Sequence, residues 1–361
     1  MQPWVTETFL PIKNRRLEAS KINKPIYAEG QLPATLVFDN LKDEYRVGYA
    51  FPMPSIQTYY RKKPVQYISN LLGHEGGGSL HALLNEKGWI KGLSAGESQV
   101  DKDNSVMAVN ISLTEAGAAH VDEISAYLFA YLNLLKDGQI EEWIYQEQAT
   151  VAQLAFRFSE KSSAMNAVRS IAPALQHYPA EDLLVAPYLM EEFDASLIRS
   201  FLTLLTRDNV LMTLSSPGYK GESTEAWFGV SYDLKLGEIS VATVDSSMLE
   251  LPKLNPFLPE SLDLAQGDAL GPKPVIADKG LELYMDTDLE FNVPRAVIHV
   301  SLRNDGGFIA LADAAQAQLY SMLVQDDLNA LAYPALLAGV SYQIAAPPRG
   351  FRVSVGGYND K

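Results

Sequence analysis

The sequence predicts an α+β fold in which one type of αβ domain is used twice. Predicted strands and predicted helices occur in separate groups along the chain. A proline-rich stretch divides the chain, and a short sequence pattern from before that stretch recurs after it. The segment "LSAGES" (93–98) resembles "LLAGVS" (336–341), and the same spacing places "AVNIS" (108–112) beside "FRVSV" (351–355). Each copy combines a helix with two strands, as expected of a repeated domain.

The first half of the chain gives the clearest element signals. Strands are predicted over 45–54, 90–98, 105–114 and 209–216, and helices over 64–74, 79–88, 114–138 and 140–158, with further helices to about 206. Ser79 and Thr114 are expected N-caps, because their hydroxyls can accept a hydrogen bond from a first-turn amide. Apolar residues three and four apart, from Val121 to Leu135, give the strongest helix signal in the chain.

Residues 246–274 are rich in proline and show no sustained period, which predicts a linker. After it we expect strands over 281–287 and 295–303, an alanine-rich helix over about 308–333, and two final strands. The predicted organisation is a lead-in segment over 1–19, a domain over 20–245, the linker over 246–274 and a partial domain over 275–361. The second copy stops soon after its paired strands, so we expect the chain to be a fragment.

Composition limits the classes of partner. The formal net charge is −15, which would repel a phosphate backbone, so we expect neither nucleic acid nor an anionic membrane as a partner. Neutral or cationic ligands such as peptides suit this charge better. The chain has no cysteine, which excludes disulfides, thiolate nucleophiles and cysteine-bound zinc. The N-terminal residues show no signal-peptide pattern and no span of about 20 apolar residues.

The segment "GHEGGGSLH" (73–81) concentrates two histidines, one carboxylate and four glycines. A zinc site would need about three ligands, and only Glu75 is available beside His74 and His81. A phosphate loop is a second interpretation, because glycines before a helix expose backbone N–H groups, but the lysine of the P-loop pattern is missing. A tight turn between two helices is the third. The sequence contains no H-x-x-E-H or H-E-x-x-H pattern.

This segment and five further motifs in order decide between these interpretations. "GHEGGGSLHALLNEKGW" is followed by "SLTEAGAAHVDEI", "AFRF", "HYPAEDLL", "TEAWFGVSY" and the terminal "VGGYNDK". Together they resemble the second, noncatalytic domain and the start of the third in the insulinase/pitrilysin family of zinc metallopeptidases, the inverzincins. The resemblance runs from about residue 40 to the last residue.

The resemblance implies a parent enzyme of four related αβ domains, with mixed or antiparallel sheets packed against helices, that encloses peptide substrates in a chamber. Zinc would be held by an H-x-x-E-H motif in the first domain. This chain lacks that domain and the fourth one. It should therefore bind no catalytic zinc, need no cofactor of its own and be inactive alone, with the missing domains and peptide substrates as its partners.

The same resemblance assigns a role to the glycine-rich segment. It implies that Gly73, His74 and Glu75, with Leu93, Ala95 and Glu97 of the following strand, capture the N-terminal segment of a substrate. An exposed strand edge with small side chains can accept a peptide as an extra strand, and Glu75 or Glu97 can pair with its α-amino group. The glycines at 76–78 replace a proline found in relatives, which affects the rigidity of this loop.

Our functional prediction is a noncatalytic, substrate-docking fragment of a zinc metalloendopeptidase. The alternative is an inactive structural or partner subunit of the same fold. The resemblance favours a bacterial periplasmic enzyme.

Overall fold

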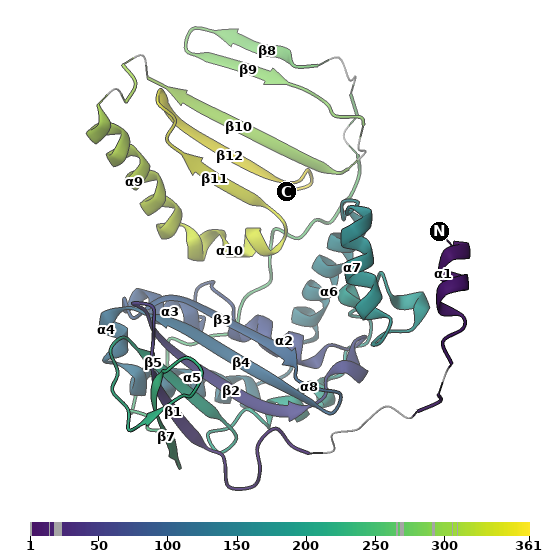
Figure 1. Cartoon of the computed structure of the whole chain (residues 1–361). Coiled ribbons are helices and arrows are strands. Elements are labelled where there is room, and N and C mark those ends of the chain that lie inside the picture. Colours follow the sequence, from purple (N-terminus) through teal and green to yellow (C-terminus); the bar gives the residue numbers. More distant parts are fainter. Residues whose placement is uncertain are drawn as a thin grey trace.

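The computed structural model describes residues 2–13, 15–17, 24–264, 266–267, 271–290, 293–304, 306–308 and 310–361. Within these residues the chain forms two lobes (Figure 1). The N-terminal lobe contains a seven-stranded sheet, and the C-terminal lobe a three-stranded sheet and a two-stranded hairpin. Helices pack against the sheets in both lobes, which confirms the predicted α+β class.

The large sheet has the strand order β3-β4-β2-β5-β1-β7-β6. Its strands are β1 (Ala34–Asp39), β2 (Tyr45–Pro54), β3 (Ile90–Gln99), β4 (Asn104–Leu113), β5 (Leu211–Ser216), β6 (Ser223–Thr224) and β7 (Ser231–Leu236). Only the β1–β5 pair is parallel among the described pairs, so the sheet is mixed. The order leaves β3 at one edge.

Helices cover one face of this sheet and enclose the core. The main ones are α2 (Pro64–Leu72), α3 (Leu80–Glu86), α5 (Val121–Asp137) and α8 (Ala195–Leu202), beside the longer α6 (Glu142–Arg157). Leu72, Leu80 and Ile124 are fully buried in the core, and each such side chain contributes about 1.5–3 kcal/mol by leaving water. Ser79 caps α3 as predicted, since its hydroxyl accepts a hydrogen bond from the Ala82 amide at 3.1 Å.

The helix expected from Thr114 to Gly138 is interrupted. Thr114 caps a short helix, α4 (Glu115–Ala118), and α5 begins only at Val121. Between them His120 leaves helical geometry (φ −119°, ψ 27°), and its ring stacks on Trp89 with 4.4 Å between centroids. This tertiary contact overrides the continuous apolar periodicity.

The C-terminal lobe contains β8 (Lys273–Asp278), β9 (Leu281–Met285), β10 (Arg295–Arg303), β11 (Ser341–Ala345), β12 (Gly350–Tyr358), α9 (Leu311–Asp327) and α10 (Asn329–Leu337). Its sheet is antiparallel with the order β10-β12-β11, and α9 lies along it (Figure 1). The single helix predicted over 308–333 is thus two helices. The predicted linker includes residues 265 and 268–270, which lie outside the described residues.

The two similar segments that indicated a repeat differ in conformation. "LSAGES" lies within β3, whereas "LLAGVS" covers the end of α10, Gly339 with φ +81°, and the first residue of β11. The other matched pair, "AVNIS" and "FRVSV", lies in strands β4 and β12 as expected. The predicted repeat therefore matches strand with strand for 108–112 and 351–355, but it matches a strand with a helix end for 93–98 and 336–341.

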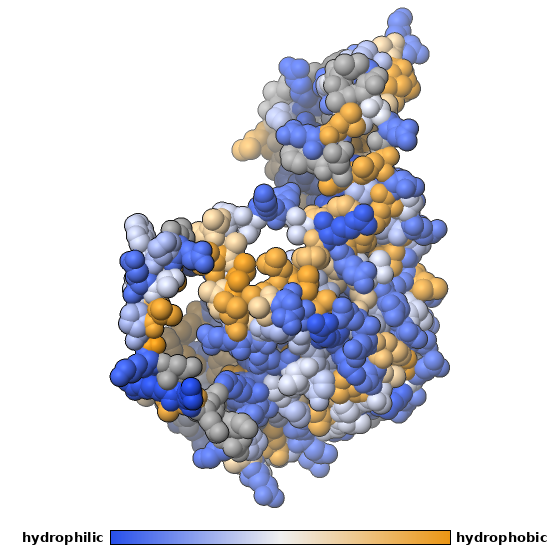
Figure 2. All heavy atoms as spheres, turned by 90° about the vertical axis from the view of Figure 1, so that its right-hand side faces the viewer, coloured by the Kyte–Doolittle hydropathy of each residue, from blue (hydrophilic) through white to orange (hydrophobic). Residues whose placement is uncertain are grey.

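Two helices stand apart from the core. The first, α1 (Gln2–Phe9), lies in the lead-in segment, and α7 (Ala164–Ala174) projects beside α6; neither has a buried residue. Met165 and Val168 of α7 are 67% and 62% exposed. Figure 2 views the molecule from this side and shows apolar side chains gathered at its surface. No helix in the described part of the chain is long and apolar enough to cross a membrane.

Candidate functional site

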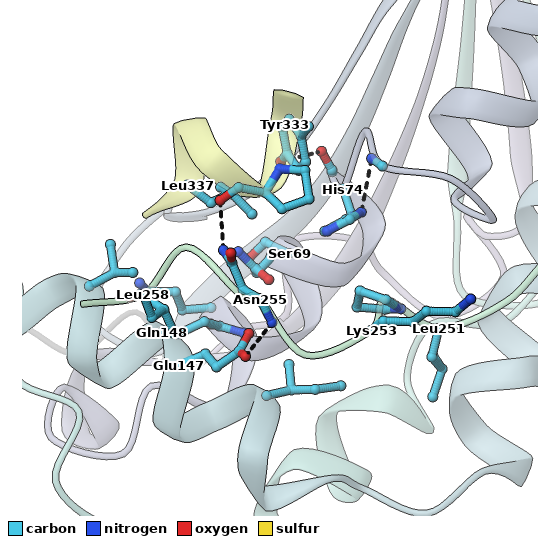
Figure 3. Close-up of a pocket in the computed structure, with 18 of the residues that line it drawn as sticks. Ser69, His74, Glu147, Gln148, Leu251, Lys253, Asn255, Leu258, Tyr333 and Leu337 are labelled. Atoms are coloured by element: carbon cyan, nitrogen blue, oxygen red, sulfur yellow. Dashed lines mark hydrogen bonds between the residues drawn. The ribbon is translucent and has the colours of Figure 1, made fainter. Parts of the chain in front are cut away.

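A cavity of about 990 Å³ lies where the two lobes meet. Residues of α2, β3 and α6 line it from the N-terminal lobe, and residues 250–258 and α10 complete it (Figure 3). Five of the six residues that the sequence assigned to substrate docking line this cavity: Gly73, His74, Leu93, Ala95 and Glu97. Glu75 lies beside it.

The strand β3 offers the cavity a free edge. Among the described strands it pairs with β4 alone, with Leu93, Ala95 and Glu97 opposite Ile111, Val109 and Met107. These three β4 residues are buried, so Leu93, Ala95 and Glu97 point to the helix-covered face of the sheet. The other edge of β3 carries the N–H and C=O groups that a further strand could pair with.

Gly73 follows the last residue of α2 and lies against this strand. Its amide donates to the Ser69 carbonyl oxygen at 2.8 Å and ends the helix. A Cβ at Gly73 would lie 3.2 Å from that oxygen and 3.6 Å from the Ala95 nitrogen. Glycine therefore allows the helix end to approach the backbone of β3 closely.

His74 is a buried, structural residue in this geometry. Its Nδ1 accepts a hydrogen bond from the Gly76 amide at 3.1 Å, and its ring meets the Tyr333 ring edge-on at 4.8 Å between centroids. Burial lowers the pKa of His74 to about 4, although the nearby Glu75 carboxylate opposes the shift. His74 is therefore uncharged at neutral pH, and the Tyr333 hydroxyl also donates to the Gly73 carbonyl oxygen at 3.3 Å.

Glu75 is engaged by the C-terminal lobe. Its carboxylate accepts a hydrogen bond from Asn329 Nδ2 at 2.8 Å, and it lines a separate cavity of about 470 Å³. His81 lines the same smaller cavity, with burial lowering its pKa. The structure thus separates the two carboxylates that the sequence treated as equivalent.

Glu97 is the carboxylate that β3 presents to the cavity. Ser69 Oγ lies 2.6 Å from Glu97 Oε2 and 2.7 Å from the Val65 carbonyl oxygen, so one hydroxyl hydrogen serves two acceptors. The Lys63 side chain donates to the Pro187 carbonyl oxygen. Burial lowers the pKa of Lys63, and attraction to Glu97 partly offsets that shift. Glu97 keeps hydrogen-bonding capacity for a further donor.

Sequence reasoning missed the residues that close the cavity. Glu147 Oε1 accepts a hydrogen bond from the backbone N–H of Asn255 at 2.8 Å. The side-chain Nδ2 of Asn255 donates to the Pro334 carbonyl oxygen at 2.7 Å (Figure 3). Burial raises the pKa of Glu147. Both side-chain amide atoms of Gln148 are buried and have no hydrogen-bond partner among the described residues. No local pattern distinguishes these residues from solvated helix and linker residues, because their role depends on the contact between lobes.

The cavity carries excess negative charge. Glu97, Glu147 and Glu250 line it, with Lys253 as the one ammonium group among the described lining residues. Such a site attracts a cationic group and repels an anion. In the ranges that the structure describes, no three His, Asp or Glu side chains are grouped so that they could hold a metal ion. The described residues of this cavity do not fit a zinc centre.

Comparison with protein families identifies the chain. Residues 1–151 match the model described as "Peptidase M16 inactive domain", and residues 156–361 match "Middle or third domain of peptidase_M16". The chain belongs to the M16 peptidase family. The resemblance to insulinase and pitrilysin is thereby confirmed, and the chain corresponds to noncatalytic domains of that family.

Relatives with curated names come from several kingdoms. The chain is 31% identical to "Insulin-degrading enzyme" of Homo sapiens over 368 residues, which is 99% of this chain and 36% of that protein. It is 29% identical to "Nardilysin-like" of Arabidopsis thaliana over 384 residues, covering 100% of this chain and 37% of the relative. The chain thus spans about a third of the length of the relatives it matches.

A solved structure shows the same fold. The "Crystal Structure of pitrilysin" superposes with a TM-score of 0.81 at 23% identity, over 98% of this chain and 39% of that one. The two M16 family models meet near the end of α6, whereas the large sheet is completed only by β6 and β7, after residue 220. The position of the domain boundary at 245 and the extent of the linker stay predictions.

Proposed function

We propose that this chain is the substrate-docking part of an M16 zinc metalloendopeptidase, whose zinc ligands lie outside it. The chain holds the N-terminal segment of a peptide as an added strand on the free edge of β3. Its further partners are the parent's first and fourth domains. A bacterial periplasmic location stays a prediction that follows from the sequence resemblance alone.

The observation that carries this proposal is the free edge of β3 beside a negatively charged cavity. Backbone groups of the edge supply affinity that is independent of sequence, and small residues such as Ala95 leave room for a second backbone. The α-amino group of the peptide finds its counter-charge at Glu97, because Glu75 is held by Asn329. His74, which is neutral at pH 7, contributes shape rather than charge.

The test compares one peptide with a free N-terminus and with an acetylated N-terminus, labelled at its C-terminus and followed by fluorescence anisotropy. We expect the free form to bind about tenfold tighter, as for one charge-assisted hydrogen bond. Glu97→Gln should remove this difference. Glu75→Gln is the matched control and should retain it, because that side chain lies outside the cavity.

Equal binding of both peptides to the wild-type chain would contradict docking of the N-terminus. Zinc-dependent hydrolysis by the purified chain, abolished by a chelator, would contradict its noncatalytic role.

The second candidate function is an inactive structural subunit. Three contacts favour it, because α10 contacts the docking loop (residues 73–78) through Asn329 and Tyr333. A structural subunit would show no preference for a free peptide N-terminus, so the same titration separates the two functions.

A further inference from the structure

A second cavity, of about 550 Å³, continues along β3 beyond the first one. The two cavities share only Gln66 and Glu97 among their described lining residues. Leu93 and Ala95 face the first cavity, and Gln99 and Val100 face the second. Glu97 therefore stands at the boundary between them.

The wall of the second cavity is aromatic and held in place. The Tyr60 and Tyr178 rings meet edge-on at 5.1 Å between centroids. The Tyr60 hydroxyl donates to Asp182 Oδ2 at 2.6 Å, and the buried Asp182 also binds the Arg61 guanidinium. These bonds fix the Tyr60 ring before any ligand arrives.

The second cavity has equal numbers of positively and negatively charged side chains among its described lining residues. Lys63 and Lys102 line it together with Glu97 and Asp101. The rest of the lining is largely aromatic and aliphatic, so the cavity offers most to a neutral, apolar side chain.

We propose that this cavity receives the side chain of the first residue of the docked peptide and selects a large apolar or aromatic residue there. The inference rests on the proposed docking function. With the α-amino group at Glu97, residue 1 lies opposite Glu97, and residues 3 and 5 lie opposite Ala95 and Leu93. Opposed residues of paired strands point to the same face, so residue 1 lies at the boundary and can enter the second cavity.

The spacing supports this register. Four residue steps from Glu97 to Leu93 extend about 13 Å, so a pentapeptide strand covers the described edge of the first cavity. Its first side chain is then the one that reaches Tyr60 and Tyr178. Burying a phenylalanine side chain there should tighten binding about 10- to 100-fold relative to glycine.

The experiment uses the whole chain and three peptides that share every residue after the first: Phe-first, Gly-first and N-acetylated Phe-first. Dissociation constants are measured by isothermal titration calorimetry. We expect Phe-first to bind about 10- to 100-fold tighter than Gly-first. Val100→Trp should fill the cavity, since Val100 lines it and is 54% exposed, and should reduce this ratio to about one.

Leu41→Trp is the matched control, because Leu41 is 75% exposed in the turn between β1 and β2 and lines neither cavity. It should keep the full preference. Tyr178→Ala removes one aromatic wall and should reduce the ratio without adding bulk, with the melting temperature checked for both cavity variants.

The outcomes separate the two proposals. A free-amine preference without any Phe-over-Gly preference overturns this inference and leaves docking intact. A Phe preference that survives Val100→Trp also overturns it. Equal binding of free and acetylated Phe-first peptides overturns the docking function, and this inference with it.

Discussion

The three consecutive glycines of the docking loop should respond differently to alanine. A Cβ at Gly76 would lie 2.6 Å from His74 Cε1 and 3.2 Å from Nδ1, whereas a Cβ at Gly77 meets nothing within 4 Å. Gly78 has φ +82°, and its Cβ would lie 3.0 Å from the Glu250 Cβ. A side chain would therefore clash at Gly76, fit without contact at Gly77 and require a left-handed backbone at Gly78.

The expected magnitudes follow from these distances. Gly76→Ala must displace the His74 ring, which is 7% exposed and packed on Tyr333, so it should cost about 1–3 kcal/mol of unfolding free energy. Gly77→Ala should stabilise by about 0.4–1 kcal/mol, because alanine restricts the unfolded chain. Gly78→Ala should cost about 1–2 kcal/mol for the left-handed backbone alone.

Urea unfolding followed by tryptophan fluorescence measures all three variants under one condition. The double variant His74→Ala/Gly76→Ala isolates the clash, since its cost should be smaller than the sum of the single costs. Equal unfolding free energies for Gly76→Ala and Gly77→Ala, within about 0.5 kcal/mol, would refute the reasoning.

Three further predictions concern the same junction. The pKa of His74 in the folded state, about 4, lies below its ordinary value of 6.5, so the unfolded state takes up a proton first as the pH falls. The unfolding free energy is therefore not reduced by His74 above pH 6.5 and decreases as the pH falls from 6.5 toward 4. Between pH 7.5 and 5.0 wild type should lose about 2 kcal/mol more than His74→Asn in urea unfolding, and parallel losses would contradict this. Gln148→Leu should raise the unfolding free energy by about 1–2 kcal/mol, because it removes two unpartnered amide atoms; a lower urea midpoint would argue against this. Tyr333→Phe should cost about 0.5–1.5 kcal/mol by removing the bond to Gly73 while keeping the ring, and an unchanged midpoint would show that this bond contributes nothing.

Local signals predicted the elements around the docking loop well. The strand over 45–54 and the helix restart at Ser79 appear as expected, because period-two alternation and a hydroxyl cap act within a few residues. β1 and β7 were not predicted. β1 has one buried residue and its parallel partner β5 begins at Leu211, so its stability comes from contacts distant in the sequence.

The candidate site also combines residues that local sequence signals placed correctly with residues that depend on contacts distant in the sequence. Residues of α2 and β3 meet in one cavity because a short, strongly patterned segment joins them. The separation of Glu75 from Glu97 depends on Asn329, which lies in another lobe. Asn255 gives no local signal either, because its two bonds join α6 to α10 across the junction.

The free edge of β3 is also an aggregation hazard. An unprotected edge invites the same strand of a second molecule, and two sheets can then extend into a fibre. Here the edge opens onto a cavity bounded by α6, α10 and residues 250–258. The walls that shape the docking cavity stand beside this edge, so they also hinder a second copy of the protein from joining it edge to edge.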